Sequence, residues 1–202
     1  KLILRISGLP KLNIVRKLFW KITTNKIFKI TCPSIELLND IKKKNFLNES
    51  KILFLPDAII NVKKFVKLKN IKIEKPNNRD FFLSVGRMTK QKNFKYLINE
   101  MSEFFKKNKN FDLYIVGDGE EKKDLQNLID RRKLNNRIFL INHTNNVYSY
   151  MKNSSLLILS SLWEDPGFVI IEAALCNLSI LSSNCSNGPK EFLLNGDAGN
   201  LF

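Results

Sequence analysis

Apolar residues in the second half of the chain fall into short runs that alternate with amphipathic stretches. Five runs are nearly continuously apolar, as in strands buried on both faces of a sheet, and they cover residues 81–85, 111–116, 137–141, 155–160 and 178–182. Four stretches with helical spacing lie among them, at residues 94–107, 121–132, 147–153 and 168–176. This alternation predicts an α/β fold, a Rossmann-like parallel sheet flanked by helices.

The first part of the chain is less regular. Lys29–Cys32 and Lys51–Leu55 have strand patterns. The helix pattern between them runs from Ser34 to Lys43, and Ser34 is its predicted N-cap. Such a sequence is typical of the end of an α/β domain.

These patterns divide the chain into three segments. We predict that residues 1–60 are the C-terminal remnant of an N-terminal Rossmann-like domain, residues 61–79 a Lys-rich linker, and residues 80–202 an incomplete second domain. The chain starts at Lys1 and stops within the strand-like residues Asn200–Phe202. We therefore expect a fragment of a longer protein, truncated at both ends.

The composition leaves two interpretations of a strong positive charge. Lys and Arg outnumber Asp and Glu by 34 to 19, which gives a net charge of +15. Such a charge attracts nucleic acid, anionic lipid or phosphorylated substrates. The lysines are scattered along the whole chain, however, which favours a compositional bias toward Lys, Asn, Ile and Phe as the main cause.

Cysteine and histidine limit the chemistry that is available. Cys32, Cys176 and Cys185 lack metal-ligand spacing, which favours reduced thiols in a cytoplasmic protein. The single His143 excludes a multi-histidine metal site within the chain. No apolar run reaches transmembrane length.

Two acids mark the strongest candidate site. Glu164 follows an apolar strand-like run, and Glu172 lies on the helix after it, at helical spacing from the apolar Phe168, Ile171 and Leu175. Burying a carboxylate costs several kcal/mol unless a partner compensates it. We therefore expect a polar ligand near Glu172, or as the alternative a buried arginine or a capped loop.

Free backbone amides are expected beside these acids. Pro166 and Gly167 mark the start of the helix that carries Phe168. Unpaired N–H groups at a helix start bind anions. The stretch thus combines amides for a phosphate with carboxylates for hydroxyl groups, the polar groups of a nucleotide-sugar.

A basic loop follows the strand at residues 81–85. Gly86 allows a sharp exit from that strand, Arg87 can bind a phosphate through two N–H groups, and Lys92 adds a point charge. The alternative is a solvated basic loop, but the predicted position at the end of a strand, on the same edge as the acids, favours a ligand site. The turn Gly117–Gly119 is less specific, because a tight strand-to-helix connection explains it equally well.

Together these motifs resemble glycosyltransferase family 4, the retaining sugar transferases with the two-domain GT-B fold. The resemblance covers residues 81–202 and rests on motifs that occur in the family's order and spacing: Gly86-Arg87 with Lys92, Gly117-Asp118-Gly119, Glu164 with Glu172, and Gly188-Pro189-Lys190-Glu191. The sequence departs from the family at Asn177, where a Gly is usual, and we expect this change to alter a turn and not the chemistry.

The resemblance implies a role for each candidate residue. Arg87 and Lys92 would neutralise the donor diphosphate, and Glu172 would accept the ribose hydroxyls. Glu164 would hold the donor hexose together with the backbone around Pro166, Gly167 and Phe168. Asn142 and His143, at the end of a strand, would flank the base. The resemblance implies no cofactor and no metal ion.

The implied function is transfer of a hexosyl residue, with retention, from a nucleotide-sugar to a glycan or lipid-linked acceptor. UDP is the expected nucleotide, and cell-surface polysaccharide or glycan assembly is the expected process. The expected location is the cytoplasm, with the inner face of the cytoplasmic membrane as the alternative. Residues 1–60 would belong to the acceptor-side domain. Two alternatives are a basic nucleic-acid-binding module and a catalytically inactive homologue; the preferred interpretation involves no nucleic acid.

One segment outside these motifs invites a membrane interpretation. Val15–Ile22 interleaves basic and aromatic residues, as do segments that rest on anionic membranes. The alternative is an ordinary helix packed on parts of the protein outside this chain.

Overall fold

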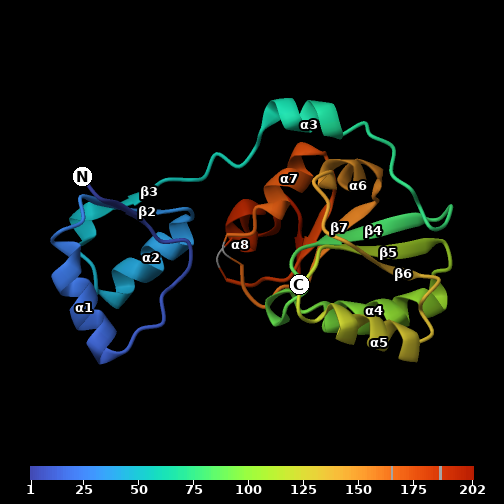
Figure 1. Ribbon diagram of the computed structural model, residues 1–202, viewed down its shortest axis with the longest axis horizontal. Coiled ribbons are helices and arrows are strands. Elements are labelled where there is room, and N and C mark those ends of the chain that lie inside the picture. The colour runs from blue at the N-terminus through green and yellow to red at the C-terminus, as the bar shows by residue number, and fades with distance from the viewer. Residues whose placement is uncertain (165, 187) are drawn as a thin grey trace.

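The computed structural model describes residues 1–164, 166–186 and 188–202. The described strands form two separate parallel sheets (Figure 1). We call the part that contains the three-stranded sheet, residues 3–54, the smaller unit, and the part that contains the six-stranded sheet, residues 80–201, the larger unit. The α/β fold with parallel sheets flanked by helices is confirmed, whereas the domain boundaries stay a prediction.

The smaller unit packs two helices on a short sheet. Its strands lie in the order β1-β2-β3, and its elements are β1 (Ile3–Arg5), α1 (Ile14–Thr24), β2 (Lys29–Cys32), α2 (Ile35–Lys44), the 3₁₀ turn η1 (Glu49–Lys51) and β3 (Ile52–Phe54). Ile30, Leu37 and Phe46 are fully buried at its centre. Trp20 packs edge-on against Phe46, with 6.2 Å between ring centroids.

The larger unit contains a six-stranded parallel sheet. Its elements are β4 (Asp80–Val85), η2 (Lys90–Lys92), α4 (Phe94–Lys107), β5 (Phe111–Val116), α5 (Lys122–Arg131), β6 (Ile138–Ile141), α6 (Val147–Asn153), β7 (Leu156–Leu159), α7 (Val169–Leu175), β8 (Ile180–Ser182), α8 (Pro189–Phe192), η3 (Leu194–Gly196) and β9 (Asn200–Leu201). The strand order is β6-β5-β4-β7-β8-β9. From β4 the chain adds β5 and β6 on one side of the sheet, and then β7, β8 and β9 on the other side. Doubly wound sheets bind ligands where the strand order reverses in this way, here between β4 and β7.

Helices cover both faces of this sheet (Figure 1). α4 and α5 lie on one face, where Ile98, Leu113 and Leu125 belong to one buried cluster. α6 and α7 lie on the other, where Leu83, Met151 and Ala173 belong to a second. Burial on both faces explains why the strands lack an alternating pattern.

Most predicted elements are confirmed to within two residues of their expected ends. α4, α6, β2 and β5 have the expected bounds. The N-cap prediction is also confirmed, because the Ser34 hydroxyl accepts a hydrogen bond of 3.2 Å from the Leu37 amide. At Asn177 the backbone is left-handed, with φ of 55°, a conformation in which glycine is the least strained residue and Asn is tolerated.

Two details differ from the sequence-based expectation. The predicted linker contains the helix α3 (Val62–Leu68), which Asn61 caps by accepting a hydrogen bond of 3.0 Å from the Lys64 amide. On α7 the predicted apolar stripe is wrong, because Leu175 is 38% exposed and the buried positions are Ile170 and Ala173. Ile170 precedes the expected Ile171 by one residue, and one residue turns an α-helix by about 100°. The helix therefore buries a neighbouring face and not the expected one.

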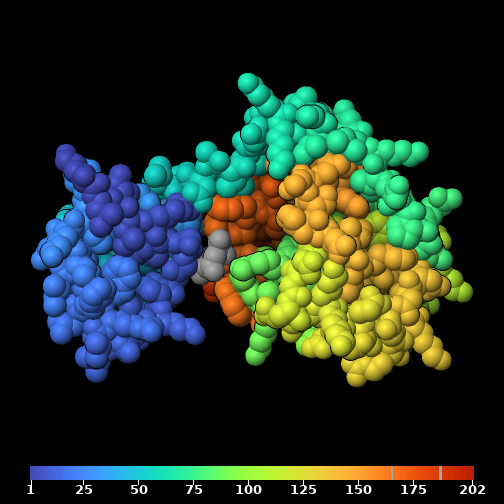
Figure 2. Space-filling model, viewed as in Figure 1, coloured from blue at the N-terminus to red at the C-terminus, as the bar shows by residue number. Residues whose placement is uncertain are grey.

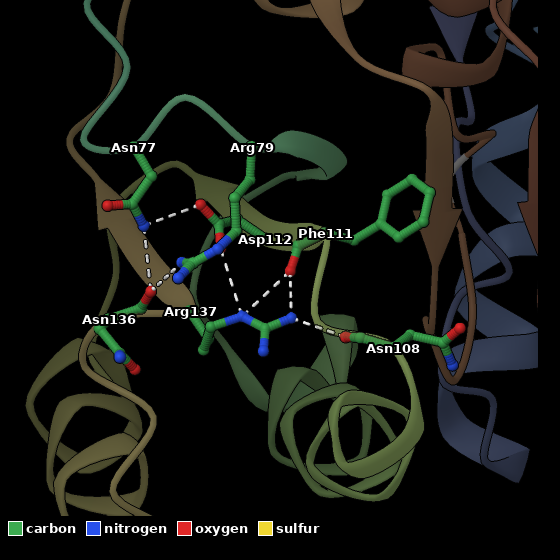
Figure 3. A network of polar contacts seen from close by, with 7 residues as sticks. All are labelled: Asn77, Arg79, Asn108, Phe111, Asp112, Asn136 and Arg137. Carbon is green, nitrogen blue, oxygen red and sulfur yellow. Dashed lines mark hydrogen bonds and ion pairs between the residues drawn. The ribbon is translucent and has the colours of Figure 1, made fainter.

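A polar network joins the amino-terminal ends of β4, β5 and β6 (Figure 3). The fully buried Asp112 forms ion pairs with Arg79 at 3.1 Å and Arg137 at 3.4 Å, and accepts a hydrogen bond of 2.9 Å from Asn77. Arg137 also donates to the backbone carbonyl of Asn108 at 2.8 Å. Burial and the nearby Arg79 charge lower the pKa of Arg137, which fits a site where two cations share one acid.

Helix α1 presents an apolar stripe to solvent. Its members are between 60% and 87% exposed, and consecutive members are one or three positions apart: Ile14, Val15, Leu18, Phe19 and Ile22. Arg16, Lys17 and Lys21 lie beside the stripe on the helix. No helix in the described part of the chain is long and apolar enough to cross a membrane.

Candidate functional site

The candidate site lies at the carboxyl ends of β4, β5 and β7. The turn after β4 packs against the turn after β5, because the Met88 amide donates a hydrogen bond of 2.8 Å to the Asp118 carbonyl. A Cβ atom at Gly117 would lie 1.9 Å from the Gly86 carbonyl oxygen, so the approach of these turns requires glycine there. The weaker motif of the sequence thus supports the loop of the stronger one.

A cavity of about 720 Å³ opens beside these turns. Its lining comes from the β4 and β5 turns, the segment after β6, and helices α3, α6 and α7: Gly86, Arg87, Gly117, His143, Tyr148, Glu172 and Lys64 are among its residues. Figure 2 shows a hollow on this face, between green and orange atoms of the larger unit. The cavity is large enough for a nucleoside-sized ligand.

Besides Asp118 of the β5 turn, the larger cavity is lined by the acid Glu172. It is half-buried on α7, and burial raises the pKa of its carboxyl group. The Tyr148 hydroxyl and the Lys64 ammonium group oppose the rise in pKa without cancelling it. The expected alternative of a buried arginine partner is not what the described residues show: the nearby cation is Lys64, on the exposed helix α3.

A second cavity, of about 260 Å³, adjoins the first. Val85, Gly86 and Arg87 line both cavities, so the β4 turn forms their shared wall. The second cavity is also lined by Lys92 and Glu164 and by the backbone at the start of α7, residues 167–169.

Glu164 is the acid of this smaller cavity. It is 3% exposed, and its Oε1 atom accepts hydrogen bonds from Lys92 Nζ at 2.6 Å and from the Ser161 hydroxyl at 2.5 Å. Among the described residues, its Oε2 atom has no hydrogen-bond partner. Lys92 therefore compensates the buried carboxylate, and one carboxylate oxygen remains for a ligand hydroxyl.

Arg87 differs from the other charged residues of the site. Its side chain is exposed, and the guanidinium group has no hydrogen bond or ion pair with the residues that the structure describes. It lies on the wall between the two cavities. Its guanidinium group is thus available to an anion that spans both of them.

Comparison with known proteins identifies this arrangement. Residues 65–202, which are 138 of the 202 residues, match the sequence model of a family described as "Glycosyl transferases group 1". The chain belongs to this family. An uncharacterised glycosyltransferase of Haemophilus influenzae is 31% identical over 176 residues, which are 85% of this chain and 47% of the relative, so this similarity extends into the smaller unit.

Two relatives show the range of the similarity. An uncharacterised glycosyltransferase of Methanocaldococcus jannaschii is 35% identical over 155 residues, which are 74% of this chain and 37% of the relative. The N-acetylgalactosamine-N,N'-diacetylbacillosaminyl-diphospho-undecaprenol 4-alpha-N-acetylgalactosaminyltransferase of Campylobacter jejuni is 30% identical over 121 residues, 60% of this chain and 32% of the relative. The matched part of the chain thus spans about a third of each of these proteins.

Solved structures agree on the fold. HepE of Anabaena, in a crystal structure with UDP and glucose, superposes with a TM-score of 0.78 at 16% sequence identity. The superposition covers 98% of this chain and 57% of HepE. Both sheets and their connection therefore follow the GT-B architecture.

The structure brings most of the predicted site residues of this group 1 glycosyltransferase together. Arg87, His143 and Glu172 line the larger cavity, and Lys92 and Glu164 line the smaller one. Two predicted residues lie elsewhere. Asn142 accepts a hydrogen bond from Lys122 and lines neither cavity, and the buried Pro166 packs against Gly188.

Sequence reasoning missed three residues that the site contains. Lys64 reaches the larger cavity from α3, within the predicted linker, and Tyr148 reaches it from α6. Ser161 binds Glu164 in the smaller cavity. A sequence signal for α3 does exist: Asn61 is a good N-cap residue, and it is followed by apolar residues three positions apart, Val62, Phe65 and Leu68. No sequence signal shows which face of α3 meets the cavity.

Among the described residues, no group of His, Cys, Asp or Glu side chains could hold a metal ion. The three cysteines are free, and Cys32 and Cys176 are buried. The cationic side chains that line the two cavities include Lys64, Arg87 and Lys92.

Proposed function

We propose that the chain is the donor-binding part of a retaining family 4 glycosyltransferase, together with the end of its acceptor-side domain. The whole protein would transfer a hexosyl residue from a UDP-sugar to a glycan or lipid-linked acceptor. One observation carries the proposal: two cavities with an acid in each share a wall that bears the unpaired Arg87. A nucleotide-sugar has this sequence of groups, with a ribose and a hexose on either side of a diphosphate.

The larger cavity would hold the nucleoside. Glu172 would accept hydrogen bonds from the ribose hydroxyls, and this bonding would offset the cost of its partly buried charge. The segment around His143 would lie along the base. The smaller cavity would hold the hexose, with Glu164 Oε2 and the amides near Gly167 as partners for its hydroxyls.

The reaction replaces one C–O bond with another. The bond between the anomeric carbon of the hexose and the diphosphate oxygen breaks, and the acceptor oxygen bonds to the same face of that carbon. The acceptor proton passes to the departing diphosphate. Arg87, aided by the Lys92 ammonium group beside Glu164, would stabilise the negative charge that builds up on the diphosphate. The proposed mechanism is metal-independent.

The acceptor and the cellular setting are inferred from relatives. The Campylobacter jejuni relative bears a name that includes a diphospho-undecaprenol-linked sugar. A lipid-linked or glycan acceptor in cell-envelope polysaccharide assembly, at the cytoplasmic face of the membrane, fits this relationship.

The exposed stripe of α1 supports a peripheral membrane contact as part of the same proposal. The five apolar side chains of the stripe would enter the headgroup region, while Arg16, Lys17 and Lys21 would meet anionic lipid phosphates. The full-length protein should sediment with vesicles of anionic phospholipid, and a Leu18→Asp, Phe19→Ser variant should stay in the supernatant. If both proteins sediment equally, or if the wild type binds neither anionic nor neutral vesicles, the stripe does not mediate membrane contact.

A thermal-shift titration of the full-length protein tests the donor site. UDP should raise the melting temperature more than GDP does, and Glu172→Ala should remove most of that increase. A wild-type protein that neither nucleotide stabilises would disprove the donor site. Chelation of divalent ions should leave the turnover of a UDP-sugar unchanged.

The two alternatives predict other outcomes. A nucleic-acid-binding module would bind oligonucleotides in a salt-dependent way that Glu172→Ala leaves unchanged. An inactive homologue would bind UDP without transferring a sugar to any acceptor preparation. Residues of three motifs line the two cavities, Gly86-Arg87 with Lys92, Gly117 to Gly119, and Glu164 with Glu172, and this supports the enzyme over both alternatives.

A further inference from the structure

Glu191 on α8 connects the larger unit to the smaller one. Its carboxylate accepts hydrogen bonds from the Ile35 amide at 3.0 and 3.1 Å and from the Glu36 amide at 3.1 Å. Both amides belong to the first turn of α2, 155 and 156 residues earlier in the chain.

The bonds complete the N-terminus of α2. The first amides of a helix have no partner within the helix. In α2 the third of them, on Leu37, is bound by its own N-cap Ser34, and Glu191 binds the first two. A carboxylate at this position also meets the positive end of the helix dipole. Glu191 of the larger unit therefore accepts hydrogen bonds from the two α2 amides that the Ser34 side chain does not bind.

Backbone contacts join the Glu191 segment to the donor site. The Glu164 amide donates a hydrogen bond of 3.0 Å to the Ser186 carbonyl, and Trp163 pairs with Ser186 in a parallel bridge. A Cβ atom at Gly188 would lie 1.7 Å from the Pro166 carbonyl oxygen, so the start of α8 rests directly on the Glu164 loop. A shift of that loop would therefore carry α8 and its carboxylate with it.

From this geometry we infer that Glu191 is a positioning residue that couples the donor site to the orientation of the smaller unit. The inference rests on the proposed function for its catalytic part. A donor sugar held by Glu164 would fix the loop, the loop would fix α8, and Glu191 would hold α2 in the arrangement that places the acceptor side over the donor sugar. Glu191 touches no substrate in this scheme.

The test uses the full-length enzyme with spin labels at Lys43→Cys on α2 and Lys123→Cys on α5, both exposed positions, in a background with the accessible Cys185 replaced by Ser. Glu191→Ala should broaden the distance distribution between the labels and lower kcat about tenfold, with the Kd of UDP changed less than about twofold. Glu191→Gln should lie between, because one amide oxygen still accepts hydrogen bonds but the charge is gone.

A substitution on the other side of the contact removes one donor without touching Glu191. Ile35→Pro deletes the first amide, and proline suits the first position of a helix. Ser34 has extended backbone angles, φ −129° and ψ 152°, which the residue before a proline prefers. Ile35→Pro should broaden the distances, and should add little to the effect of Glu191→Ala in the double variant. The neighbouring Lys190→Ala, at an exposed position, is the control and should change nothing.

The outcomes separate this inference from the donor site. An unchanged distance distribution and kcat in Glu191→Ala overturns the coupling, whatever UDP does. Failure of the wild type to bind UDP overturns the donor site, while the distance measurement still decides the contact. Fully additive effects of Ile35→Pro and Glu191→Ala would show that the two residues act independently, and would also overturn it.

Discussion

The two ends of the six-stranded sheet carry similar residue types in opposite states. At the amino-terminal end, Arg79 and Arg137 are paired with the buried Asp112 (Figure 3). At the carboxyl end, Arg87 is unpaired among the described residues and Glu172 keeps a raised pKa. Charges that are satisfied within the fold contribute to its stability, whereas charges left without full compensation are available to a ligand.

The comparison also separates two kinds of acid at the carboxyl end. Glu164 resembles Asp112 in that cationic and polar side chains compensate its charge, but Lys92 and Ser161 both bind the same oxygen. Its other oxygen has no hydrogen-bond partner among the described residues. Glu172 is offset only partly, by Tyr148 and Lys64. Glu164 is therefore expected to serve both stability and binding, and Glu172 mainly binding.

Arg87→Ala should give the largest effect at the carboxyl end. We expect kcat of the full-length enzyme to fall about 10³-fold, because a preorganised cation near the leaving diphosphate is lost. The melting temperature should stay within about 1 °C, since the side chain is exposed and unpaired. Steady-state turnover and calorimetry of the same preparation check both values. Lys90→Ala, on the same loop and exposed, is the matched control, and a loss of less than threefold for Arg87→Ala would remove it from the mechanism.

Asp112→Asn should give the converse result at the amino-terminal end. Removing the acid leaves two cations without compensation, so we expect a loss of about 3 kcal/mol in the free energy of unfolding. Urea denaturation measures the loss, and UDP affinity at a permissive temperature should be unchanged. Asp124→Asn, in an exposed pair with Lys95, should cost less than about 0.5 kcal/mol. Reduced UDP affinity in folded Asp112→Asn would mean that the two ends are coupled.

Glu172→Gln should weaken UDP binding about tenfold and stabilise the unliganded protein at neutral pH. The folded-state pKa of Glu172 lies above its ordinary 4.5, so its charge destabilises the fold once the pH rises above that value. The variant should therefore melt on the order of 2 °C higher than wild type at pH 7, with no gain below pH 4.5.

The same variant predicts a pH profile for binding. Wild-type UDP affinity should fall as the pH drops through the raised pKa, because the ribose hydroxyls bind the carboxylate form, and the Gln variant should lose this dependence. Titration calorimetry from pH 4.5 to 7.5 measures both. A variant that binds UDP as tightly as wild type would assign Glu172 to structure alone.

Lys64→Ala should produce the smallest effect, a loss of about threefold in UDP affinity. Lys64 lines the larger cavity from an exposed helix, where its charge is screened by solvent. The loss should shrink in high salt. Lys63→Ala, one position earlier on α3, is the control; equal effects of the two would indicate general attraction of UDP by the basic surface.

The fold of the larger unit was predictable because its signals are local. Runs such as Phe111–Val116 and the stripe of Phe94–Lys107 have the bounds expected from periodicity. The strand β1 was missed because it is three residues long with one partly buried position, too short for a periodic pattern. On the short helix α7, seven residues left two apolar faces to choose between, and the wrong one was preferred.

The site was predictable as a set of residues but not as a set of contacts. Strand ends and motif spacing indicated Arg87, Lys92, Glu164 and Glu172. The pairing of Lys92 with Glu164 depends on the tertiary structure, because the two residues are 72 positions apart in the sequence. The cap that Glu191 provides for α2 depends on how two units meet, and no local pattern encodes it.

The placement of the two tryptophans gives this chain a built-in optical probe. Trp20 packs against Phe46 inside the smaller unit, and Trp163 is adjacent to Glu164 and half-exposed. Because each unit holds one of the two, replacing Trp20 with Phe leaves an emitter beside Glu164, and replacing Trp163 leaves one that reports unfolding of the smaller unit. Quenching by a bound nucleotide and the order in which the units melt can then be followed separately, without any added label.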